Sequence, residues 1–265
     1  MKIIDLSDEH KSLYFVCLED WSEEMKESGS HKEVWYDKIK DKGLGVKLAV
    51  DDDGKACGMI QYIPIEESAV DGKDLYFIYC IWVHGYKKKG VGNRQKRGMG
   101  KALLEAAEAD AKAKRANGIA AWGLALPFWM KASWFKKQGY KKVDKQGFQT
   151  LLWKPFSENA VPPKWVKQNK KPVIHEGKVT VTSFKNGWCP AQNIVFERAK
   201  RAVAELGDKV IFREIDTFDK EVFLEWGISD ALFIGQKQVR TGPPPSYEKI
   251  KKKITKKVRK LTRHR

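Results

Sequence analysis

A basic, glycine-containing segment, GNRQKRGMGK at residues 92–101, connects a long apolar run to a strongly helical stretch. Its last two glycines allow a ligand to approach the backbone, because no side chain blocks the way. The unpaired N–H groups and the dipole at the start of a helix favour an anion. Lys96, Arg97 and Lys101 add positive charge. The segment therefore predicts a phosphate-binding loop; the plainer alternative is a basic surface loop that caps an ordinary helix.

Two common phosphate-binding motifs do not fit this segment. A Walker A loop would need glycine where the chain has Gln95, and Ser or Thr where it has Ala102. A dinucleotide-binding fingerprint that starts at Gly98 would need glycine where the chain has Leu103. The pattern that does fit is Q-x-x-G-x-G, formed by Gln95, Gly98 and Gly100.

The elements expected around this loop form a mixed α/β domain. The apolar, aromatic run at 74–83 is typical of a central strand that is covered on both faces. Other strands are expected at 1–6, in a hairpin at 45–64, and at 118–126 and 147–156; helices are expected at 8–26, 31–42, 98–115 and 128–140.

A second, smaller unit follows a segment rich in proline, lysine and asparagine. Such a composition without periodicity predicts a linker. The domains expected are therefore 1–156, a linker at 157–177 and a second domain at 178–265. In the second domain we expect strands at 179–184 and 209–215, helices at 191–206 and 219–226, a hairpin at 231–239 and a basic terminal helix.

The Q-x-x-G-x-G motif, the element order of residues 1–155 and the segment SWFKKQGY at 133–140 together resemble the GNAT N-acetyltransferases. The resemblance implies an acyl-CoA N-acyltransferase fold of the α/β (α+β) class. It implies an enzyme that transfers an acetyl group from acetyl-CoA to an amine by direct attack, with no metal. It also implies that Val83 offers its backbone to the thioester and that the pyrophosphate binds the amides of 96–101. The residues expected to hold the cofactor are Gln95, Lys96, Arg97, Gly98, Met99, Gly100 and Lys101.

The chain departs from the family pattern at two places. The family usually has about five residues between the valine at the strand end and the Gln or Arg of the loop, whereas Val83 and Gln95 lie twelve positions apart. Residues 84–93 therefore contain a basic insertion. The tyrosine that often protonates the leaving thiolate aligns with Phe135, so that acid is missing.

Candidates for the remaining chemistry each have a structural alternative. His84 has an intrinsic pKa suited to a general base, or it is a hydrogen-bonded structural histidine. Cys80 is a candidate catalytic thiol, or a buried core residue. Glu66 and Glu67 are candidates to act through water, or they are a solvated pair.

In the second domain, Cys189 lies just before a helix whose first residue is Pro190. A helix N-terminus lowers the pKa of a thiol and can make it reactive. The element order resembles a thioredoxin-like domain, but the second cysteine of a W-C-x-x-C motif aligns with Gln192, and the usual GIPT aligns with GISD at 227–230. Monothiol chemistry or a structural role remains.

The segment DALFIGQKQVRTGPPPSYEKIKKKI at 230–254 extends the resemblance to nearly the whole chain. Together with AWGLALPFWMKASWFKKQGYKKVD, it resembles the YoaP family of acetyltransferases, which carry a GNAT domain followed by a characteristic C-terminal domain. This resemblance supports the architecture; it does not identify the amine acceptor.

Positive charge is concentrated at the C-terminal end. The chain of 265 residues has a net charge of +17, and ten Lys or Arg with no acid lie in residues 249–265. Ile250, Ile254 and Val258 recur at helical spacing among these charges. We expect either a terminal helix packed on its own domain, or a contact with RNA, the ribosome, an acidic protein or an acidic membrane.

Other features limit the setting of the protein. The four cysteines show no spacing typical of zinc sites or paired disulfides, which favours a reducing cytoplasm. No apolar run approaches the roughly 18 to 20 residues of a membrane span. Besides the acetyltransferase, two functions stay open: a non-catalytic CoA-binding protein whose basic tail contacts an anionic surface, and a monothiol redox protein that uses Cys189.

Overall fold

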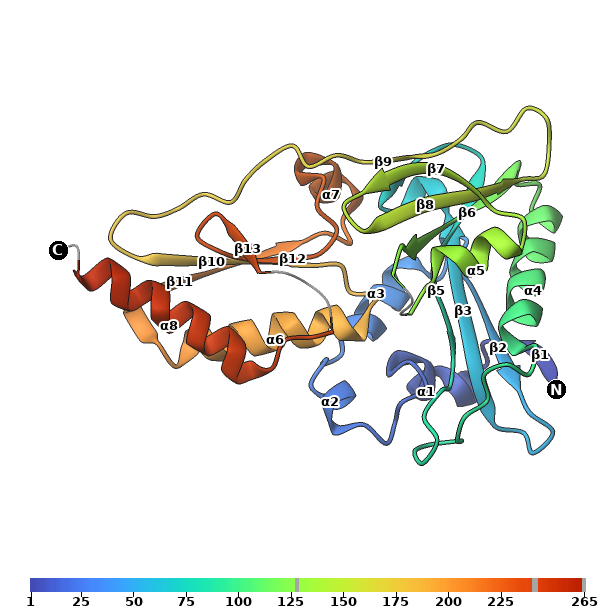
Figure 1. Ribbon diagram of the computed structural model, residues 1–265, viewed down its shortest axis with the longest axis horizontal. Coiled ribbons are helices and arrows are strands. Elements are labelled where there is room, and N and C mark those ends of the chain that lie inside the picture. Colours follow the sequence, from blue (N-terminus) through green and yellow to red (C-terminus); the bar gives the residue numbers. More distant parts are fainter. Residues whose placement is uncertain (127–128, 240–242, 264–265) are drawn as a thin grey trace. The chain divides into compact units, whose positions relative to one another are not determined.

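The computed structural model describes residues 1–126, 129–239 and 243–263, and the chain divides into two compact units (Figure 1). The first unit consists of residues 1–21 and 37–166, and the second of residues 22–36 and 167–265. Each unit contains its own β-sheet. Phe128, at the start of the expected helix 128–140, and the last two residues of the basic tail lie outside the described residues.

The first unit is built on a seven-stranded sheet in the order β1-β2-β3-β5-β6-β8-β7. Neighbouring strands are antiparallel except β5 and β6, which are parallel. The strands are β1 (Lys2–Asp5), β2 (Gly45–Val50), β3 (Ala56–Pro64), β5 (Leu75–Val83), β6 (Gly118–Leu124), β7 (Lys141–Gln146) and β8 (Gln149–Pro155).

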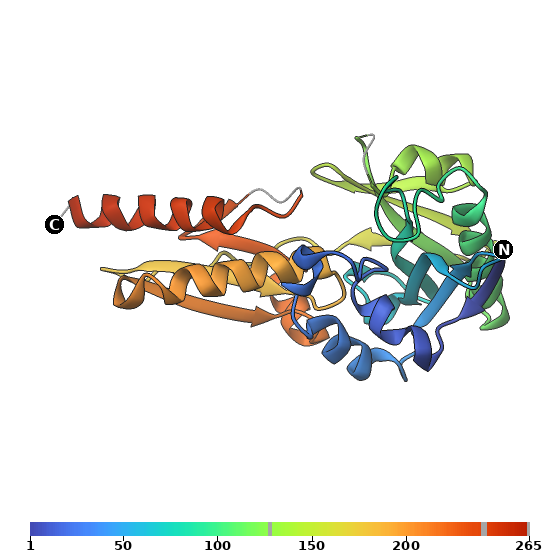
Figure 2. The ribbon, with the colours of Figure 1, turned by 90° about the horizontal axis from the view of Figure 1, so that it is seen from below.

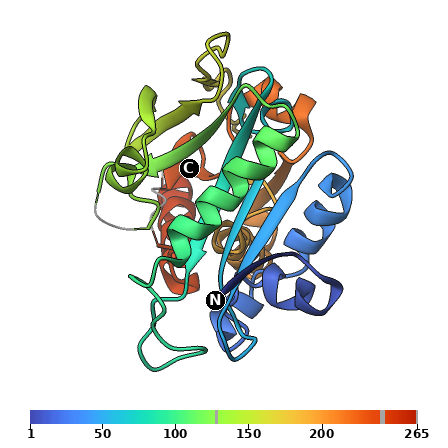
Figure 3. The same ribbon diagram turned by 90° about the vertical axis from the view of Figure 1, so that its right-hand side faces the viewer.

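The apolar run predicted as a central strand is β5, and its first six residues are buried. Helix α4 (Met99–Ala113) lies across the sheet (Figure 3). Its buried residues Leu103, Leu104 and Ala107 recur at the spacing of one helix face. A shorter helix, α5 (Ala132–Lys137), packs on β6 and β8. These elements hold the end of β5 next to the start of α4.

The single helix expected at 8–26 is wrong. The segment contains a 3-10 turn (Asp8–His10), α1 (Lys11–Phe15) and α2 (Glu23–Lys26), followed by α3 (His31–Ile39). Cys17 and Leu18 have φ values of +53° and +63°, and a right-handed helix cannot contain two such residues. The chain therefore turns after α1, and α2 lies in the second unit.

The predicted linker at 157–177 is partly structured. Strand β9 (Lys164–Trp165) pairs with β4 (Val70–Asp71) in the first unit. The Trp165 ring contacts the Phe77 ring edge-on, and the backbone N–H of Trp165 donates to the Asp144 carboxylate at 2.9 Å. This apolar contact and hydrogen bond fix a segment whose composition is that of a linker.

The second unit has a four-stranded sheet in the order β11-β10-β12-β13. Strands β10 and β11 are parallel, whereas β12 is antiparallel to both of its neighbours. The strands are β10 (Val179–Lys185), β11 (Val210–Asp216), β12 (Ala231–Ile234) and β13 (Lys237–Val239), and the helices are α6 (Pro190–Ala204), α7 (Lys220–Trp226) and α8 (Tyr247–Arg263).

Helices α6 and α8 pack against each other and against the sheet of the second unit (Figure 2). Ile250, Ile254 and Val258 of α8 are buried in the same apolar cluster as Val181 and Leu232 of the sheet. The prediction that the terminal helix packs on its own domain is confirmed for this apolar face.

None of the helices in the described ranges is both long enough and apolar enough to cross a membrane. The same residues contain no group of three His, Cys, Asp or Glu side chains arranged to hold a metal ion.

Candidate functional site

The central feature of the first unit is a split between its two parallel strands. Strands β5 and β6 pair only from Leu75 opposite Gly118 to Ile78 opposite Ala121. Beyond this point β6 continues to pair with β8 as far as Leu124. The edge of β5 that faces β6 has no strand partner from residue 79 to 83 in the described chain. It therefore lacks the ladder of hydrogen bonds that a neighbouring strand would provide.

A β-bulge lies at the position of the split. On the β3 side, Gln61 is opposite Cys80 and Tyr62 is opposite Ile78, so that Tyr79 is an extra residue in β5. A bulge bends its strand and increases the local twist, which turns the end of β5 away from β6. The indole N–H of Trp122 on β6 donates to the Tyr79 carbonyl at 2.8 Å and closes the inner end of the split.

The predicted phosphate loop lies beside the open end of this split. Helix α4 starts after Gly98, and the Ala102 N–H makes the first helical hydrogen bond, to the Gly98 carbonyl. Within the described chain, the N–H groups of residues 96–101 donate to no protein acceptor. Gly98 has a φ of +81°, and a Cβ built on it would meet nothing within 4 Å. The loop is thus an accessible set of unpaired amides at a helix start, which is a ready anion site.

The loop is connected directly to the end of β5. The Gln95 side-chain amide donates to the Val83 carbonyl at 3.2 Å. The His84 N–H donates to the Cys57 carbonyl on the β3 side, and alternate residues of a strand direct their backbone groups to opposite sides. The backbone groups of Val83 therefore face the split. A Cβ built on Gly100 would lie 3.8 Å from the Val83 side chain, so the helix start and the strand end are adjacent.

The electrostatics of the loop favour an anion. Lys96 and Arg97 are exposed and have no ion-pair partner among the described residues. Lys101 lies 3.6 Å from Glu105, and both side chains are largely exposed, so this pair is weak. Arg94 is different, because it pairs with the Asp51 carboxylate at 2.9 Å. The structure thus brings together every residue that the motif predicted, from Val83 to Lys101, at one place.

The insertion at 84–93 is a closed loop. The Arg94 N–H donates to the His84 carbonyl at 2.8 Å and joins the two ends of the loop. The Lys89 ammonium lies 4.8 Å from the centre of the Trp21 ring, a cation–π contact. Gly90, with a φ of +51°, lies against Trp21 and His84, where any Cβ would clash.

His84 holds this loop from inside. Its side chain is fully buried. Nδ1 lies 2.8 Å from the Gly92 carbonyl, and Nε2 accepts from the Trp21 indole N–H at 3.3 Å. Both ring nitrogens are therefore occupied, which defines the tautomer with hydrogen on Nδ1. This geometry favours the structural alternative for His84 over the general base.

A pair of substitutions separates the two roles of His84. Asn retains a donor near the position of Nδ1, whereas Ala leaves the buried Gly92 carbonyl unpaired at a cost of about 1–3 kcal/mol. We expect His84→Ala to lower the melting temperature clearly more than His84→Asn. We also expect the shape of the pH dependence of kcat/KM to persist in both variants. Loss of one limb of that pH profile in both variants would show that His84 is the base.

The other catalytic candidates lie in structural settings. Cys80 is 4% exposed within β5. Glu66 accepts from the Asp74 N–H at 2.7 Å, and Glu67 pairs with the Lys42 ammonium at 3.1 Å. Phe135 is fully buried in α5. The position that aligns with the family's proton-donating tyrosine is therefore a core position in this protein.

Trp122 is a site residue that the sequence analysis missed. It lies within an apolar strand, where an aromatic residue usually means core packing. Trp122 closes the inner end of the split because the Tyr79 carbonyl does not pair with the backbone of β6 and can accept from the indole. The bulge at Tyr79 is the reason that this backbone pairing is absent. The nearest signal in the sequence is the density of tryptophan around β6 and α5, where Trp129 contacts the Trp122 ring at 5.3 Å.

In the second unit, Cys189 is the N-cap residue of α6 and Pro190 occupies the first turn, as predicted. The Cys189 side chain is only 9% exposed, and the neighbouring Trp188 is also buried. A reactive thiol needs access as well as a helix dipole. The burial favours the structural role of Cys189.

Asp230, the last residue of the GISD segment, is a partly buried carboxylate. Burial raises its pKa from 3.8 to about 6, although the Asn186 amide donates to it at 3.0 Å and opposes the shift. Because the folded pKa is above the unfolded one, ionisation costs stability. The cost appears as the pH rises from about 4 to about 6 and remains complete above that range.

We expect Asp230→Asn to stabilise the second unit at pH 7.5 by about 2–3 kcal/mol, since each pKa unit corresponds to about 1.4 kcal/mol. Asn keeps the acceptor for Asn186. Thermal unfolding of both proteins between pH 4 and 7.5 tests this expectation. The difference should vanish at pH 4; a constant difference at every pH would contradict the role of the ionised carboxylate.

Comparison with known proteins supports the fold of the first unit. Residues 6–127 match the family model of the acetyltransferase (GNAT) family. The predicted GNAT acyl-CoA N-acyltransferase fold, with a smaller α/β unit after it, is thus confirmed as a fold class. The comparison with curated protein sequences gave no match.

Several solved structures are similar to the chain. The PaiA N-acetyltransferase of Thermoplasma acidophilum, in complex with coenzyme A, is 20% identical, with a TM-score of 0.42, over 59% of this chain and all of that one. A GNAT family acetyltransferase of Brucella melitensis, in complex with acetyl-CoA, is 17% identical, with a TM-score of 0.40, over 61% and 90%. YhbS of Escherichia coli, in complex with CoA, is 10% identical, with a TM-score of 0.43, over 62% and 88%.

Proposed function

We propose that the GNAT acetyltransferase domain formed around residues 6–127 transfers the acetyl group of acetyl-CoA to an amine. The observation that carries this proposal is the combination of an open β5 edge with a helix start whose amides are unpaired. The Gln95–Val83 hydrogen bond at 3.2 Å holds the two together. An extended chain with a diphosphate at one end fits both parts at once.

The residues of the loop bind the cosubstrate in this proposal. The amides of residues 96–101 donate to the diphosphate, and Lys96, Arg97 and Lys101 add attraction. The pantetheine arm lies along the end of β5 near Val83, much as an added strand would. Lys87 and Lys88 of the insertion are exposed and have no ion-pair partner among the described residues, so they are available to the remaining phosphate of the nucleotide.

The chemistry consists of positioning and charge stabilisation. The amine nitrogen attacks the thioester carbon, the carbon–sulfur bond breaks, and the amine loses one proton. In this proposal, a backbone N–H of the β5 edge stabilises the developing oxyanion. Because Phe135 has no hydroxyl, the thiolate leaves without the acid that the family often supplies at this position. Since both ring nitrogens of His84 are occupied, the proton of the amine leaves through solvent.

Transfer of labelled acetyl groups from acetyl-CoA to a panel of small amines, polyamines, aminoglycosides and peptide N-termini tests the proposal. Turnover on any acceptor supports it. Tight binding of CoA without turnover on any acceptor would favour a non-catalytic CoA-binding protein. The absence of a hydroxyl group at Phe135 supports this second function. Absence of CoA binding would contradict both functions.

For the second unit we infer a thioredoxin-like arrangement, as expected of a YoaP-type protein. The supporting observations are the parallel pair β10–β11 connected through α6, the antiparallel β12 and β13, and the closing helix α8. Monothiol redox chemistry at Cys189 is the less favoured function, because the thiol is buried. Its test is a pH titration of Cys189 alkylation: a pKa at or above about 8.5, the value of a free thiol, would exclude it.

A further inference from the structure

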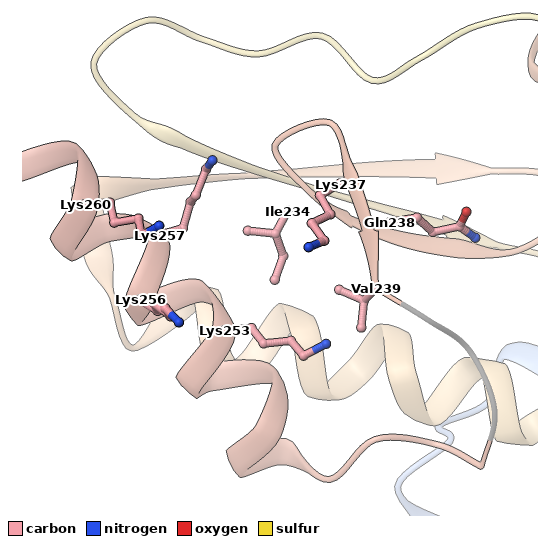
Figure 4. Close-up of a pocket in the computed structure, with 8 residues that line it drawn as sticks. All are labelled: Ile234, Lys237, Gln238, Val239, Lys253, Lys256, Lys257 and Lys260. Atoms are coloured by element: carbon pink, nitrogen blue, oxygen red, sulfur yellow. The ribbon is translucent and has the colours of Figure 1, made fainter.

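A groove rich in lysine lies in the second unit, between the β12–β13 hairpin and helix α8 (Figure 4). Its volume is about 330 Å³, and Ile234 and Val239 form its apolar floor. The polar residues that line it, which we call the lysine groove, are Lys237, Gln238, Lys253, Lys256, Lys257 and Lys260.

Carboxylates of the described residues do not neutralise the five ammonium groups of the lysine groove. No carboxylate is among the described residues that line the groove, and none of the five lysines forms an ion pair with another described residue. Lys251, on another face of α8, does pair with a carboxylate, that of Glu205. Like charges gathered on one surface raise the local concentration of anions and favour an anionic ligand.

The spacing of the lysines suits a ligand with regularly repeated charges. Lys253, Lys256, Lys257 and Lys260 recur three and four positions apart, so they lie on one face of α8. With a rise of about 1.5 Å per residue, they cover roughly 10 Å along the helix. One strand of a nucleic-acid duplex places about three phosphates in that length.

The buried face of α8 disfavours a membrane as the partner. An amphipathic helix binds a lipid surface by inserting its apolar face. In α8 that face consists of Ile250, Ile254 and Val258, which are buried in the core of the second unit. Only the charged face of α8 is available to a partner, and this face forms one wall of the lysine groove.

Two observations disfavour an acidic protein segment. None of the described residues that line the groove is an arginine, the side chain that binds carboxylates in a bidentate manner. Its edge strand β13 has three residues, Lys237–Val239. A short edge strand carrying lysine is a typical protection against pairing with another chain, so a peptide would gain few backbone hydrogen bonds there.

We propose that the lysine groove binds the phosphate backbone of nucleic acid. The lining residues that the structure describes include no aromatic side chain, so they offer no platform on which bases could stack. Among the described lining residues, Gln238 is the single amide side chain that could read a base edge, and the lysines bind phosphates in this proposal. Binding is therefore independent of base sequence and prefers a duplex to a single strand. This inference does not depend on the acetyl-transfer proposal.

The test measures binding of the full chain to fluorescent RNA and DNA duplexes of about 20 base pairs, and to single-stranded RNA, between about 50 and 200 mM salt. About three to five phosphate contacts predict that log K falls with log salt with a slope of about −3 to −4.5. A duplex of either kind should bind more tightly than the single strand. The stronger of the two duplexes identifies which nucleic acid the groove prefers.

Two triple variants with equal loss of charge make the test specific. Lys253→Gln/Lys256→Gln/Lys260→Gln removes the groove charges. Lys252→Gln/Arg259→Gln/Arg263→Gln removes three exposed charges from the adjacent face of the same helix. Glutamine is nearly as good a helix former as lysine, so both variants should keep the wild-type melting temperature.

We expect the groove variant to bind at least about 30-fold more weakly at low salt, with a salt slope that is shallower by about 2 to 3, and the control variant to stay within about threefold of wild type. Equal losses in both variants would overturn the proposal, because the effect would then be general charge. Displacement of RNA by polyglutamate of the same charge at equal concentration would also overturn it, in favour of an acidic protein. Absence of binding at low salt would overturn it outright.

Discussion

Gly98→Asp is expected to weaken CoA binding roughly 30- to 100-fold relative to Gly98→Asn. Gly98 has a φ of +81°, and its surroundings are open, so a side chain there meets no protein atom within 4 Å. Asn and Asp both tolerate left-handed backbone conformations, so they share the same backbone cost. Only Asp adds a carboxylate beside the diphosphate, and two charges about 5 Å apart near a surface repel by about 2–3 kcal/mol.

Calorimetric titration with CoA measures the effect, and Gly98→Asn is the matched control. Higher salt should reduce the gap between the two variants, because the carboxylate is exposed to solvent. Equal affinities of the Asp and Asn variants would show that the amides of 96–101 do not hold the diphosphate. Such a result would remove the support for acetyl-CoA as cosubstrate while leaving the fold unchanged.

Arg198→Met is expected to destabilise the second unit by about 2–3 kcal/mol, since it breaks a buried charged network. The Arg198 guanidinium on α6 donates to Glu27 and Glu24 at 3.0–3.1 Å and to the Pro245 carbonyl at 3.1 Å. Its side chain is 8% exposed, whereas Glu24 is 53% exposed. Because the carboxylates are partly solvated, the expected loss in the free energy of unfolding lies at the lower end of the range for buried ion pairs.

Hydrogen exchange resolves this effect in the second unit. Protection of the α6 amides should fall roughly 30- to 150-fold, which corresponds to the expected free energy. Arg201→Met is the control, because Arg201 lies 3.5 Å from Glu27 and is 54% exposed; we expect less than about 0.5 kcal/mol. Comparable losses in both variants would contradict the special role of Arg198.

The same network predicts a pH dependence. The hydrogen bond from Arg198 lowers the pKa of Glu27 below its ordinary value of 4.5. The stabilisation is therefore present above that ordinary value and is lost as the pH falls through the folded pKa. The stability gap between wild type and Arg198→Met should narrow in acid.

Several features followed from the sequence because they depend on neighbouring residues. The Q-x-x-G-x-G motif combines glycine, positive charge and a helix start within seven positions, and all three are local properties. The continuous apolar run of β5 and the apolar face of α8 are likewise periodic patterns that a single segment carries. These patterns were enough to predict the loop, the central strand and the packed terminal helix.

Other features depend on contacts between residues far apart in the chain. The tertiary structure brings Trp21, His84 and Gly92 together, and only this contact shows that both ring nitrogens of His84 are occupied. The sequence around 8–26 has helical spacing, yet the backbone turns at Cys17 and Leu18. Glu24 of helix α2 and the C-cap residue Glu27 then form ion pairs with Arg198, which lies 171 positions beyond Glu27. A local pattern carries no information about such partners.

By itself, the sequence determined the chemical groups that the loop offers to a ligand. Backbone amides, glycines and charged side chains are local properties of consecutive residues. Only the tertiary structure decided where this chemistry is usable. The Tyr79 bulge separates β5 from β6 and exposes a backbone edge beside the helix start. The hairpin that carries Lys237 lies opposite the lysines of α8, and together they form the walls of the lysine groove. The free energies of strand pairing and helix packing add up many contacts between residues that are far apart in the sequence. These contacts form only when the whole chain is folded.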